Sequence, residues 1–443
     1  MKYILFFLSF IFCISGYSQT RDISEDTTVY GIWDLQGKVL DRNGCIYGNV
    51  EIRNAILSGN PYIRKFDTTV RFTNCKAREF STAWYGASSK INDNHIYLQK
   101  SIDACIISGV SKNLYIADSY KFSKTLKLQY LYNGSYTGFA LNFYGDGDIW
   151  DRRTKLTYTN TDLTSPAIAI QMAKGGRVSN FTLTGSYPAP IYYDSSYYFN
   201  AFPSYPGYSG IVVDYDGSKN TGGSTGLKIE DIVVDGFDVL YDISPNGVTY
   251  NADIIRLTDI QCGHGRIGVR SNQAQEKGNI INNIASWGRI HTIFQSGKSG
   301  KFQGGDYVIN GGNIAGLPVQ LLDVQQSGWN NLSINDLYAE SLGRIGYIGS
   351  STSQHKIPIT LNKVRIRFAP RELAGEQVLI TSQAPRLIVN NSILWYYGYV
   401  GRIMKFSGNI IFDNCDFGAS IWSNPSCVNE IHTTMGIITR NTQ

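Results

Sequence analysis

A short pattern of alternating aliphatic and polar positions recurs through most of the chain. Each copy ends in Asn or Asp, and these terminal residues are Asn180, Asp231, Asp259, Asn283, Asp336, Asn391 and Asn414. They are separated by 51, 28, 24, 53, 55 and 23 residues, which we interpret as one or two repeats of about 24–28 residues. The triplet Gly-Arg-Ile recurs at related intervals, at 265–267, 288–290, 343–345 and 401–403.

Each repeat contains two or three short β-branched strands and no helical periodicity. One repeat cannot bury its own apolar face, whereas stacked repeats bury a continuous core. The pattern therefore predicts an all-β fold, a right-handed parallel β-helix. Asn or Asp at a recurring turn fits this fold, because both tolerate left-handed backbone geometry and can bond the next coil. The Leu-x-x-Leu-x-Leu frame of leucine-rich repeats is missing, and a propeller needs longer, four-stranded units.

One segment departs from the strand pattern and predicts a helix. Asn92, Asp93 and Asn94 supply capping residues, and the helix should end near Gly109. An apolar stripe at helical spacing follows the caps, formed by Leu98, Ile102, Cys105 and Ile106. We expect this helix to cover the first coil and protect its open strand edges.

The first 19 residues have the pattern of a signal peptide. Lys2 precedes an apolar run at 3–14 and a small, polar stretch at 15–19. The run is too short to span a membrane, and Phe12 before Cys13 argues against a lipid anchor. We expect a secreted or periplasmic protein without an integral membrane segment after cleavage. Its parts would be a β-extension at 20–90, the β-helix at 91–430 and a tail at 431–443.

Composition narrows the class of protein. Hydrophobic residues make up 42% of the 443 residues and charged residues 17%, which is typical of a folded chain. The net charge of +5 is too small and too dispersed to indicate nucleic-acid binding. The six cysteines beyond residue 19 include no CxxC pair, so no zinc site is predicted. Cys415 and Cys427 are close enough for a disulfide, and buried unpaired thiols are the alternative.

Several segments together resemble the opening of the pectate-lyase-like β-helix superfamily. They are Leu98-Gln-Lys-Ser-Ile-Asp-Ala104, the strand at 113–117 with Tyr120, the turn Gly145-Asp-Gly147, and Thr154-Lys-Leu-Thr-Tyr158. The stretch from Val39 to Trp84-Tyr85-Gly86-Ala87 resembles the N-terminal β-extension of exported bacterial members. The resemblance implies the same fold for most of the chain. It does not imply one reaction, because this fold is found in lyases, hydrolases, epimerases and binding proteins.

One candidate site follows from an alignment of three strands. Aligning 211–214 with 239–242 and 267–270 places Asp214, Asp242 and Arg270 in one outward column on three successive coils. Two carboxylates about 5 Å apart would shift each other's pKa and could serve as acid and base. Asp216 would add a third acid, so a calcium site is possible, although no cofactor is predicted. The alternative is a solvated charge ladder in which Arg270 neutralises Asp242.

A second candidate site is a basic column beside aromatic and acidic residues. In each Gly-Arg-Ile triplet an Arg precedes an inward Ile, which predicts one outward column of Arg266, Arg289, Arg344 and Arg402. Nearby in sequence are His264, His291, Trp287 and Glu340. Such a column suits an acidic sugar polymer, with His264 and Glu340 as catalytic candidates and the others as substrate ligands. The alternative is Arg stems that pack along the coil.

Gly263-His264-Gly265 is similar to a motif of polygalacturonases, which degrade an acidic polymer. The acidic motifs that hydrolyse the bond in that family, Asn-Thr-Asp and an Asp-Asp pair, are missing from the preceding coil. Membership of that family is therefore not predicted.

Residues 186–209 interrupt the repeat with a stretch that is rich in aromatic residues. Tyr197, Tyr198 and Tyr205 are the members that we expect to stack on sugar rings. The alternative is a self-packed loop that caps a coil edge. As a long surface insertion, the stretch should be removable without loss of the fold.

These patterns predict a secreted carbohydrate-active β-helix protein with a polysaccharide as its partner. Two enzymatic activities stay open, a polysaccharide lyase and a glycoside hydrolase, each acting on an acidic polymer. A non-catalytic glycan-binding or cell-surface protein on the same scaffold is the alternative.

Overall fold

The computed structural model describes most of the chain after residue 24. The predicted signal peptide and Cys427 lie outside the described residues. These are 25–41, 43–147, 154–188, 202–216, 222–245, 253–272, 276–296, 305–325, 331–348, 359–368, 377–382, 387–396, 404–407, 410–416 and 437–440.

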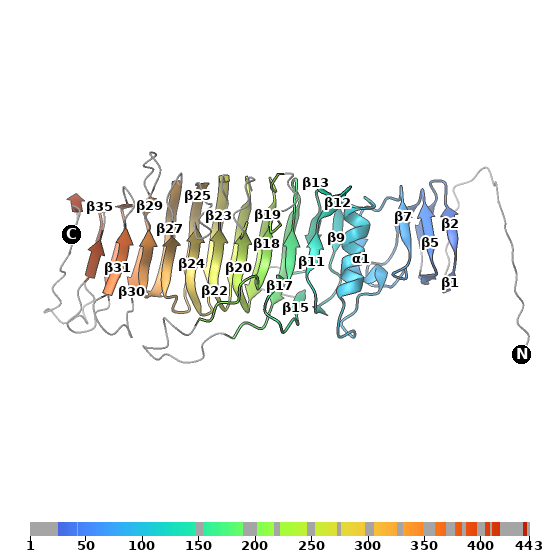
Figure 1. Ribbon diagram of the computed structural model, residues 1–443, viewed down its shortest axis with the longest axis horizontal. Coiled ribbons are helices and arrows are strands. Elements are labelled where there is room, and N and C mark those ends of the chain that lie inside the picture. Colours follow the sequence, from blue (N-terminus) through green and yellow to red (C-terminus); the bar gives the residue numbers. More distant parts are fainter. Residues whose placement is uncertain are drawn as a thin grey trace, which may run out of the picture.

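Two long parallel sheets form the body of the protein, an elongated stack of coils (Figure 1). The larger sheet contains β8 (Phe80–Ser81), β9 (Asn113–Tyr115), β10 (Tyr120–Phe122), β14 (Asn142–Tyr144), β15 (Lys155–Tyr158), β17 (Arg177–Thr184), β19 (Lys228–Asp235), β21 (Arg256–Cys262), β23 (Glu276–Ser286), β25 (Gly305–Ile314), β27 (Asn331–Leu342), β29 (Ile359–Asn362), β30 (Arg365–Phe368), β32 (Leu387–Asn390), β33 (Ile393–Tyr396), β35 (Ile410–Asp413) and β36 (Ile437–Arg440). The smaller sheet contains β11 (Leu126–Leu128), β16 (Ile168–Ile170), β18 (Ser209–Val213), β20 (Phe237–Ile243), β22 (Gly265–Ser271), β24 (Ile290–Ser296), β26 (Gln320–Val324), β28 (Arg344–Ile348), β31 (Gln377–Ser382) and β34 (Met404–Ser407). The all-β, right-handed parallel β-helix is confirmed.

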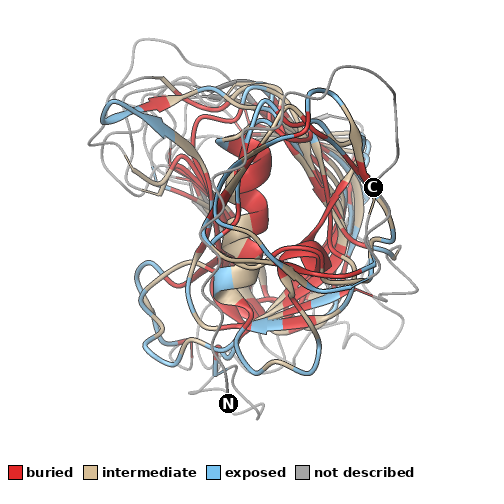
Figure 2. Ribbon diagram, turned by 90° about the vertical axis from the view of Figure 1, so that its right-hand side faces the viewer, coloured by how far each residue is buried: buried red, intermediate tan, exposed pale blue. Residues whose placement is uncertain are grey.

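The core is a set of columns in which like residues stack from coil to coil. One column of the larger sheet is aliphatic or aromatic at every step and fully buried, and it contains Leu114, Phe143, Val178, Ile229, Leu257, Ile281, Ile309, Ile334, Leu361, Val389 and Phe412. Seen along the long axis, the coils form a ring whose interior is lined by buried residues (Figure 2). Each coil thus covers the apolar face of the next.

The recurring Asn and Asp residues all adopt the predicted left-handed backbone conformation. The seven have φ between 48° and 61°. Gly311 and Lys363 take the same conformation in the coils where the pattern showed no Asn or Asp at this position. Gaps of 53 and 55 residues are therefore two coils each. The gap of 51 is one coil that contains the aromatic insertion, because β17 pairs directly with β19.

The predicted helix is α1 (His95–Ile106), and its apolar stripe is buried. Asp93 Oδ1 accepts a hydrogen bond from the backbone of His95 at 3.1 Å, whereas Asn94 bonds the preceding loop instead of capping the helix. The helix lies across the ring of coils and contacts β9 and β11 of the first coil (Figure 2). Its predicted place over the first coil is confirmed.

The part before α1 is itself built of short parallel coils. Its elements are β1 (Thr27–Thr28), β2 (Gly31–Asp34), β3 (Val39–Asp41), β4 (Ile46–Tyr47), β5 (Val50–Arg53), β6 (Ile56–Ser58), β7 (Arg71–Thr73) and the 3-10 helix η1 (Thr82–Tyr85). Asn54 and Asn74 are left-handed here, and Asn74 Nδ2 donates to Asn54 Oδ1 at 2.6 Å. The antiparallel hairpin of β12 (Tyr130–Tyr132) and β13 (Ser135–Thr137) projects from the first coils.

Five cysteines in the described part of the chain are buried, unpaired thiols: Cys45, Cys75, Cys105, Cys262 and Cys415. Cys262 shows why, since it occupies a core column between Val234 and Ser286. For these five cysteines, the alternative of buried unpaired thiols therefore applies, and not a disulfide. No helix among the described residues is long and apolar enough to cross a membrane.

Candidate active site

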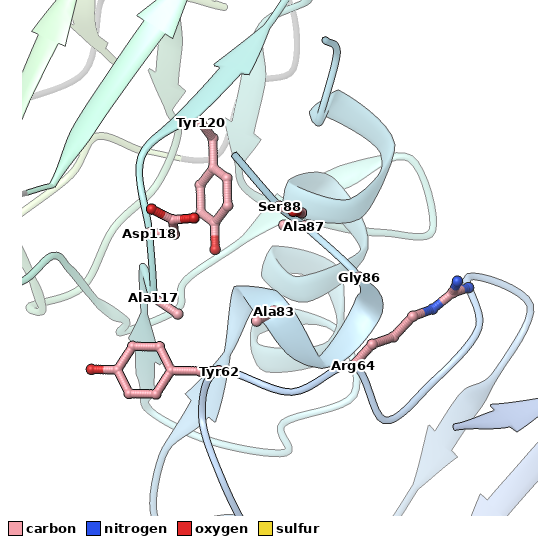
Figure 3. Close-up of a pocket in the computed structure, with 9 residues that line it drawn as sticks. All are labelled: Tyr62, Arg64, Ala83, Gly86, Ala87, Ser88, Ala117, Asp118 and Tyr120. Carbon is pink, nitrogen blue, oxygen red and sulfur yellow. The ribbon is translucent and has the colours of Figure 1, made fainter. Parts of the chain in front are cut away.

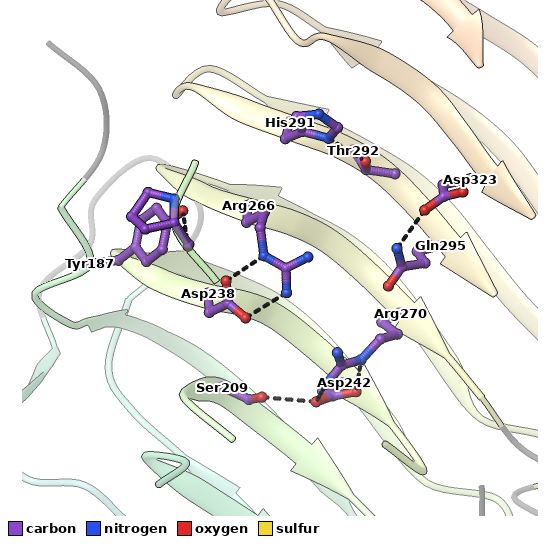
Figure 4. A network of polar contacts seen from close by, with 11 residues as sticks. Tyr187, Ser209, Asp238, Asp242, Arg266, Arg270, His291, Thr292, Gln295 and Asp323 are labelled. Carbon is purple, nitrogen blue, oxygen red and sulfur yellow. Dashed lines mark hydrogen bonds and ion pairs between the residues drawn. The ribbon is translucent and has the colours of Figure 1, made fainter. Parts of the chain in front are cut away.

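Asp242 and Arg270 are partners on adjacent strands, as the alignment predicted. Arg270 Nε donates to Asp242 Oδ1 at 2.9 Å, and its Nη2 donates to Oδ2 (Figure 4). Ser209 Oγ also donates to Oδ2, at 2.8 Å. Only 1% of the Asp242 side chain and 13% of the Arg270 side chain are exposed. This is a buried ion pair and not a solvated ladder, so Asp242 has neither the exposure nor the free oxygens to reach a polymer.

Asp214 does not belong to this column, and the predicted alignment was wrong by two residues. Ile211 pairs with Tyr241, and Val212 faces Asp242. Asp214 lies in the turn after β18 with φ 53°, where it accepts hydrogen bonds from Ser224 N at 2.6 Å and Ser224 Oγ at 2.8 Å. Burial raises its pKa. A shift of two residues preserves the alternation of inward and outward positions, so the pattern could not reveal the error.

The three acids of the suggested calcium site do not meet. Asp216 accepts a hydrogen bond from Tyr136 Oη at 2.7 Å, while Asp214 and Asp242 have the separate partners given above. Within the described ranges no group of three His, Cys, Asp or Glu side chains is placed to hold a metal ion.

A second buried ion pair lies beside the first and was missed in the sequence. Arg266 donates from Nε and Nη2 to the two oxygens of Asp238, both at 2.7 Å (Figure 4). Tyr187, from the start of the aromatic insertion, lies close enough for its raised pKa to include a contribution from Asp238 after that of burial. The spacing of 28 residues is that of Asp242 and Arg270, and this was the signal that could have found the pair.

The predicted arginine column does not form, because the turns between strands differ in length from coil to coil. Arg266 is level with His291, Arg344 is level with Gln320, and the carbonyl of Arg289 accepts from Gly265 N. Arg344 Nε donates to Gln320 Oε1 at 2.9 Å, and burial lowers the Arg344 pKa. Arg402 lies outside the described residues.

The predicted substrate ligand His291 and the predicted catalytic residue Glu340 both have structural partners. His291 packs its ring against Phe202 at 5.6 Å, and its Nδ1 lies 2.8 Å from Thr292 Oγ1. Glu340 is on the larger sheet, where it pairs with Arg367 at 3.2 Å and not with the histidines.

The aromatic insertion is part of the core at both ends. Tyr187, Phe202 and Tyr208 are buried, and Tyr205 packs edge-on against Tyr187 at 5.8 Å. Tyr208 Oη accepts a hydrogen bond from Ser186 N at 2.9 Å. The idea of a dispensable surface loop is therefore wrong for these ends. Tyr197 and Tyr198 lie outside the described residues.

His264, Asp235 and Trp287 come together at the corner between the two sheets. Asp235 ends β19, His264 lies between β21 and β22, and Trp287 lies between β23 and β24, on three successive coils. The carboxylate of Asp235 accepts from the His264 backbone N–H at 2.7 Å and lies 3.0 Å from its Nδ1. Trp287 meets the His264 ring edge-on at 5.4 Å. His264 and Trp287 were predicted from the sequence, and Asp235 was missed.

Gly263 is what allows Asp235 to reach His264. A Cβ at position 263 would lie 2.3 Å from Asp235 Oδ1, closer than any van der Waals contact. The Gly-His dipeptide is thus a local requirement of this corner, since the carboxylate must lie against the backbone to accept both hydrogen bonds.

The corner has the chemistry of an oriented base. A carboxylate can only accept, so His264 Nδ1 donates to Asp235 and Nε2 is left as the acceptor of the neutral ring. The His264 side chain is 39% exposed and the Trp287 residue 41%, so solvent and ligands can reach both. An exposed indole supplies a flat apolar surface beside that acceptor.

Asp235 gives a prediction for pH dependence. Burial raises its pKa, but the hydrogen bonds from His264 outweigh burial, so the pKa lies below the ordinary 3.8. A lowered acid pKa stabilises the fold above the unfolded-state value and ceases to do so as the pH falls through the folded-state value. Asp235→Asn should therefore cost roughly 1 kcal/mol near pH 6, the difference between a charged and a neutral acceptor.

In urea unfolding that difference from the unsubstituted protein should shrink as the pH falls below 3.8 and through the lowered pKa of Asp235, because the folded-state carboxyl then becomes protonated. An equal difference above and below the lowered pKa would show that charge at Asp235 is not what stabilises this corner.

Comparisons with known proteins extend only to distant structural similarity. No protein-family model and no curated protein matches the sequence. The catalytic domain of Agl-KA is 12% identical, with a TM-score of 0.47 over 82% of this chain and 68% of that one. A GH87 alpha-1,3-glucanase catalytic domain in complex with nigerose is 12% identical, with a TM-score of 0.37 over 80% and 68%.

The enzymatically active domain of bacteriophage CBA120 tailspike protein 2 is 15% identical, with a TM-score of 0.33 over 80% of this chain and 45% of that one. These are carbohydrate-active β-helix domains, and the likeness concerns the architecture.

Proposed function

We propose that this protein is an exported polysaccharide lyase that cleaves an acidic polymer by β-elimination, with His264 as the base. The observation that supports this most directly is the His264–Asp235 pair beside the exposed indole of Trp287. Export is the part of the proposal that rests on the first 19 residues alone.

The proposed reaction begins at the carbon that bears the sugar carboxylate. His264 Nε2 takes the C5 proton, and the electron pair forms the C4–C5 double bond. The C4–O bond breaks with its electrons on the leaving oxygen, which takes up a proton from water to give the released sugar. Asp235 orients the ring and stabilises the imidazolium that forms. A cation must offset the developing charge, and Lys155, whose positive charge helps to lower the pKa of Asp235, is our candidate.

Hydrolysis is less well supported than elimination. Glycoside hydrolysis usually needs two carboxyl groups that flank the bond. The two predicted for that role, Asp214 and Asp242, are buried and hydrogen-bonded to protein donors. The same burial supports the second candidate function, a non-catalytic glycan-binding protein in which Trp287 is a binding platform.

The test is His264→Asn. Its amide can still donate to Asp235 from about the position of Nδ1, but it has no counterpart of Nε2. On a panel of acidic polysaccharides, we expect the absorbance of unsaturated uronates to appear about 10²–10⁴-fold more slowly than with the unsubstituted protein. The control is His291→Asn, which removes a histidine that packs on Phe202 and should leave the rate unchanged.

Equal rates for His264→Asn and the unsubstituted protein would remove His264 from the mechanism. Binding of a polymer without any product from the unsubstituted protein would favour the glycan-binding alternative.

A further inference from the structure

A pocket of about 620 Å³ lies at the junction between the N-terminal coils and the main β-helix. Tyr62 and Arg64 come from the segment after β6, Ala83 and Gly86 from η1 and its end, and Asp118 from the loop between β9 and β10 (Figure 3). It is separate from the His264 corner. Four parallel steps lead from the coil of Leu114 to that of Leu257, or about 19 Å at ~4.8 Å a step.

One wall of the pocket is a fixed aromatic ring. Tyr62 is 61% exposed, yet its Oη lies 3.0 Å from Tyr115 Oη and the two rings meet edge-on at 6.1 Å. An exposed ring held in place offers a flat apolar face at little cost in side-chain entropy. Ala83, Ala87 and Ala117 also line the pocket, and their small side chains let a ligand approach closely.

The charged groups of the pocket are also fixed in place. Asp118 accepts hydrogen bonds from Ser119 N at 2.7 Å and Ser89 N at 3.3 Å, which leaves further lone pairs of its carboxylate for a ligand. Arg64 donates to Asp67 at 2.9 Å. Its stem lies against Gly86, where a Cβ would be 3.0 Å from Arg64 Cδ.

Asp118 repels an anion and can accept hydrogen bonds from a ligand. The Arg64 guanidinium is paired with Asp67 and lies over the Tyr47 ring. It points away from Tyr62 and Asp118 (Figure 3), so only its stem borders the pocket. A neutral ligand that donates hydrogen bonds and has apolar C–H faces satisfies every wall of the pocket. The volume is in the range of small-ligand pockets. We infer that this pocket binds a neutral saccharide unit, with Tyr62 stacked on the sugar ring and Asp118 accepting from its hydroxyls. This site goes beyond the proposed function and does not depend on it.

The experiment is calorimetric titration of the full mature chain with cellobiose, galactobiose and mannobiose, and with digalacturonate and choline as charged probes. At least one neutral disaccharide should bind, and more tightly than either charged probe. Tyr62→Ala and Asp118→Ala should each raise its Kd at least about tenfold. The control is Tyr132→Ala, which removes a tyrosine of similar exposure, 59%, on the hairpin and should leave Kd unchanged.

Three results would overturn the inference: no binding of any neutral disaccharide, a Kd that neither Tyr62→Ala nor Asp118→Ala changes, or tighter binding of digalacturonate or choline. Tyr62→Ala should also leave the rate of uronate release unchanged, so a failure of the lyase proposal and a failure of this site give different results.

Discussion

Arg270→Met should lower the free energy of unfolding by about 3–5 kcal/mol, because it leaves the buried charge of Asp242 without its partner. Methionine keeps much of the apolar stem, so the loss reports mainly on charge and hydrogen bonds. Urea unfolding at neutral pH measures it. The matched control is Arg53→Met, which breaks the partly exposed pair of Arg53 and Glu51 and should cost under about 1 kcal/mol.

The double variant Arg270→Met with Asp242→Asn should recover much of the loss, since no charge then stays buried without a counter-charge. If Arg270→Met were as mild as Arg53→Met, the pair would be accessible to water. Asp242 would then return as a candidate for catalysis.

Tyr208→Ala should also be strongly destabilising, by about 3–5 kcal/mol, the usual cost of removing a large aromatic side chain from a core. Tyr208 is fully buried and packs against Tyr158 at 6.2 Å and Phe237 at 5.1 Å. The measurement is again the free energy of unfolding. Tyr208→Phe keeps the ring, loses the bond to Ser186 N, and should cost only about 1 kcal/mol.

A small effect of Tyr208→Ala would mean that the aromatic insertion packs only on itself. This is the self-packed loop that was the alternative hypothesis for residues 186–209. The structure instead ties both ends of the insertion into the β-helix core. Removal of the insertion should therefore destabilise the coils on either side.

The fold was predictable because each coil repeats the same physical requirements. Asn283 and Asp336 mark one bend by their left-handed geometry, and Ile281 and Ile334 mark the buried position just before it. Close to this bend, the strands of the larger sheet pair in the same register from coil to coil, so this register could be obtained from the sequence.

The site was harder to predict because it lies where turns vary in length. His264 and Trp287 were chosen as candidates through the triplets near them, but Asp235 has no repeated neighbour that points to it. Asp214 was misplaced because a shift of two residues leaves the alternation of inward and outward side chains unchanged. Asp242 is buried by residues from other strands, such as Ser209 and Arg270. The sequence next to Asp242 does not indicate this.

The two buried ion pairs have a consequence for how the coils find their neighbours. The stack has near-translational symmetry, so a folding chain that skipped one coil would still place aliphatic on aliphatic along the core columns. It would not satisfy the ion pairs, because Asp242 would then face Gln295 and Asp238 would face His291. Each would be a buried carboxylate without its guanidinium, at a cost of several kcal/mol. These two pairs therefore favour the correct pairing of neighbouring coils over a pairing in which one coil is skipped.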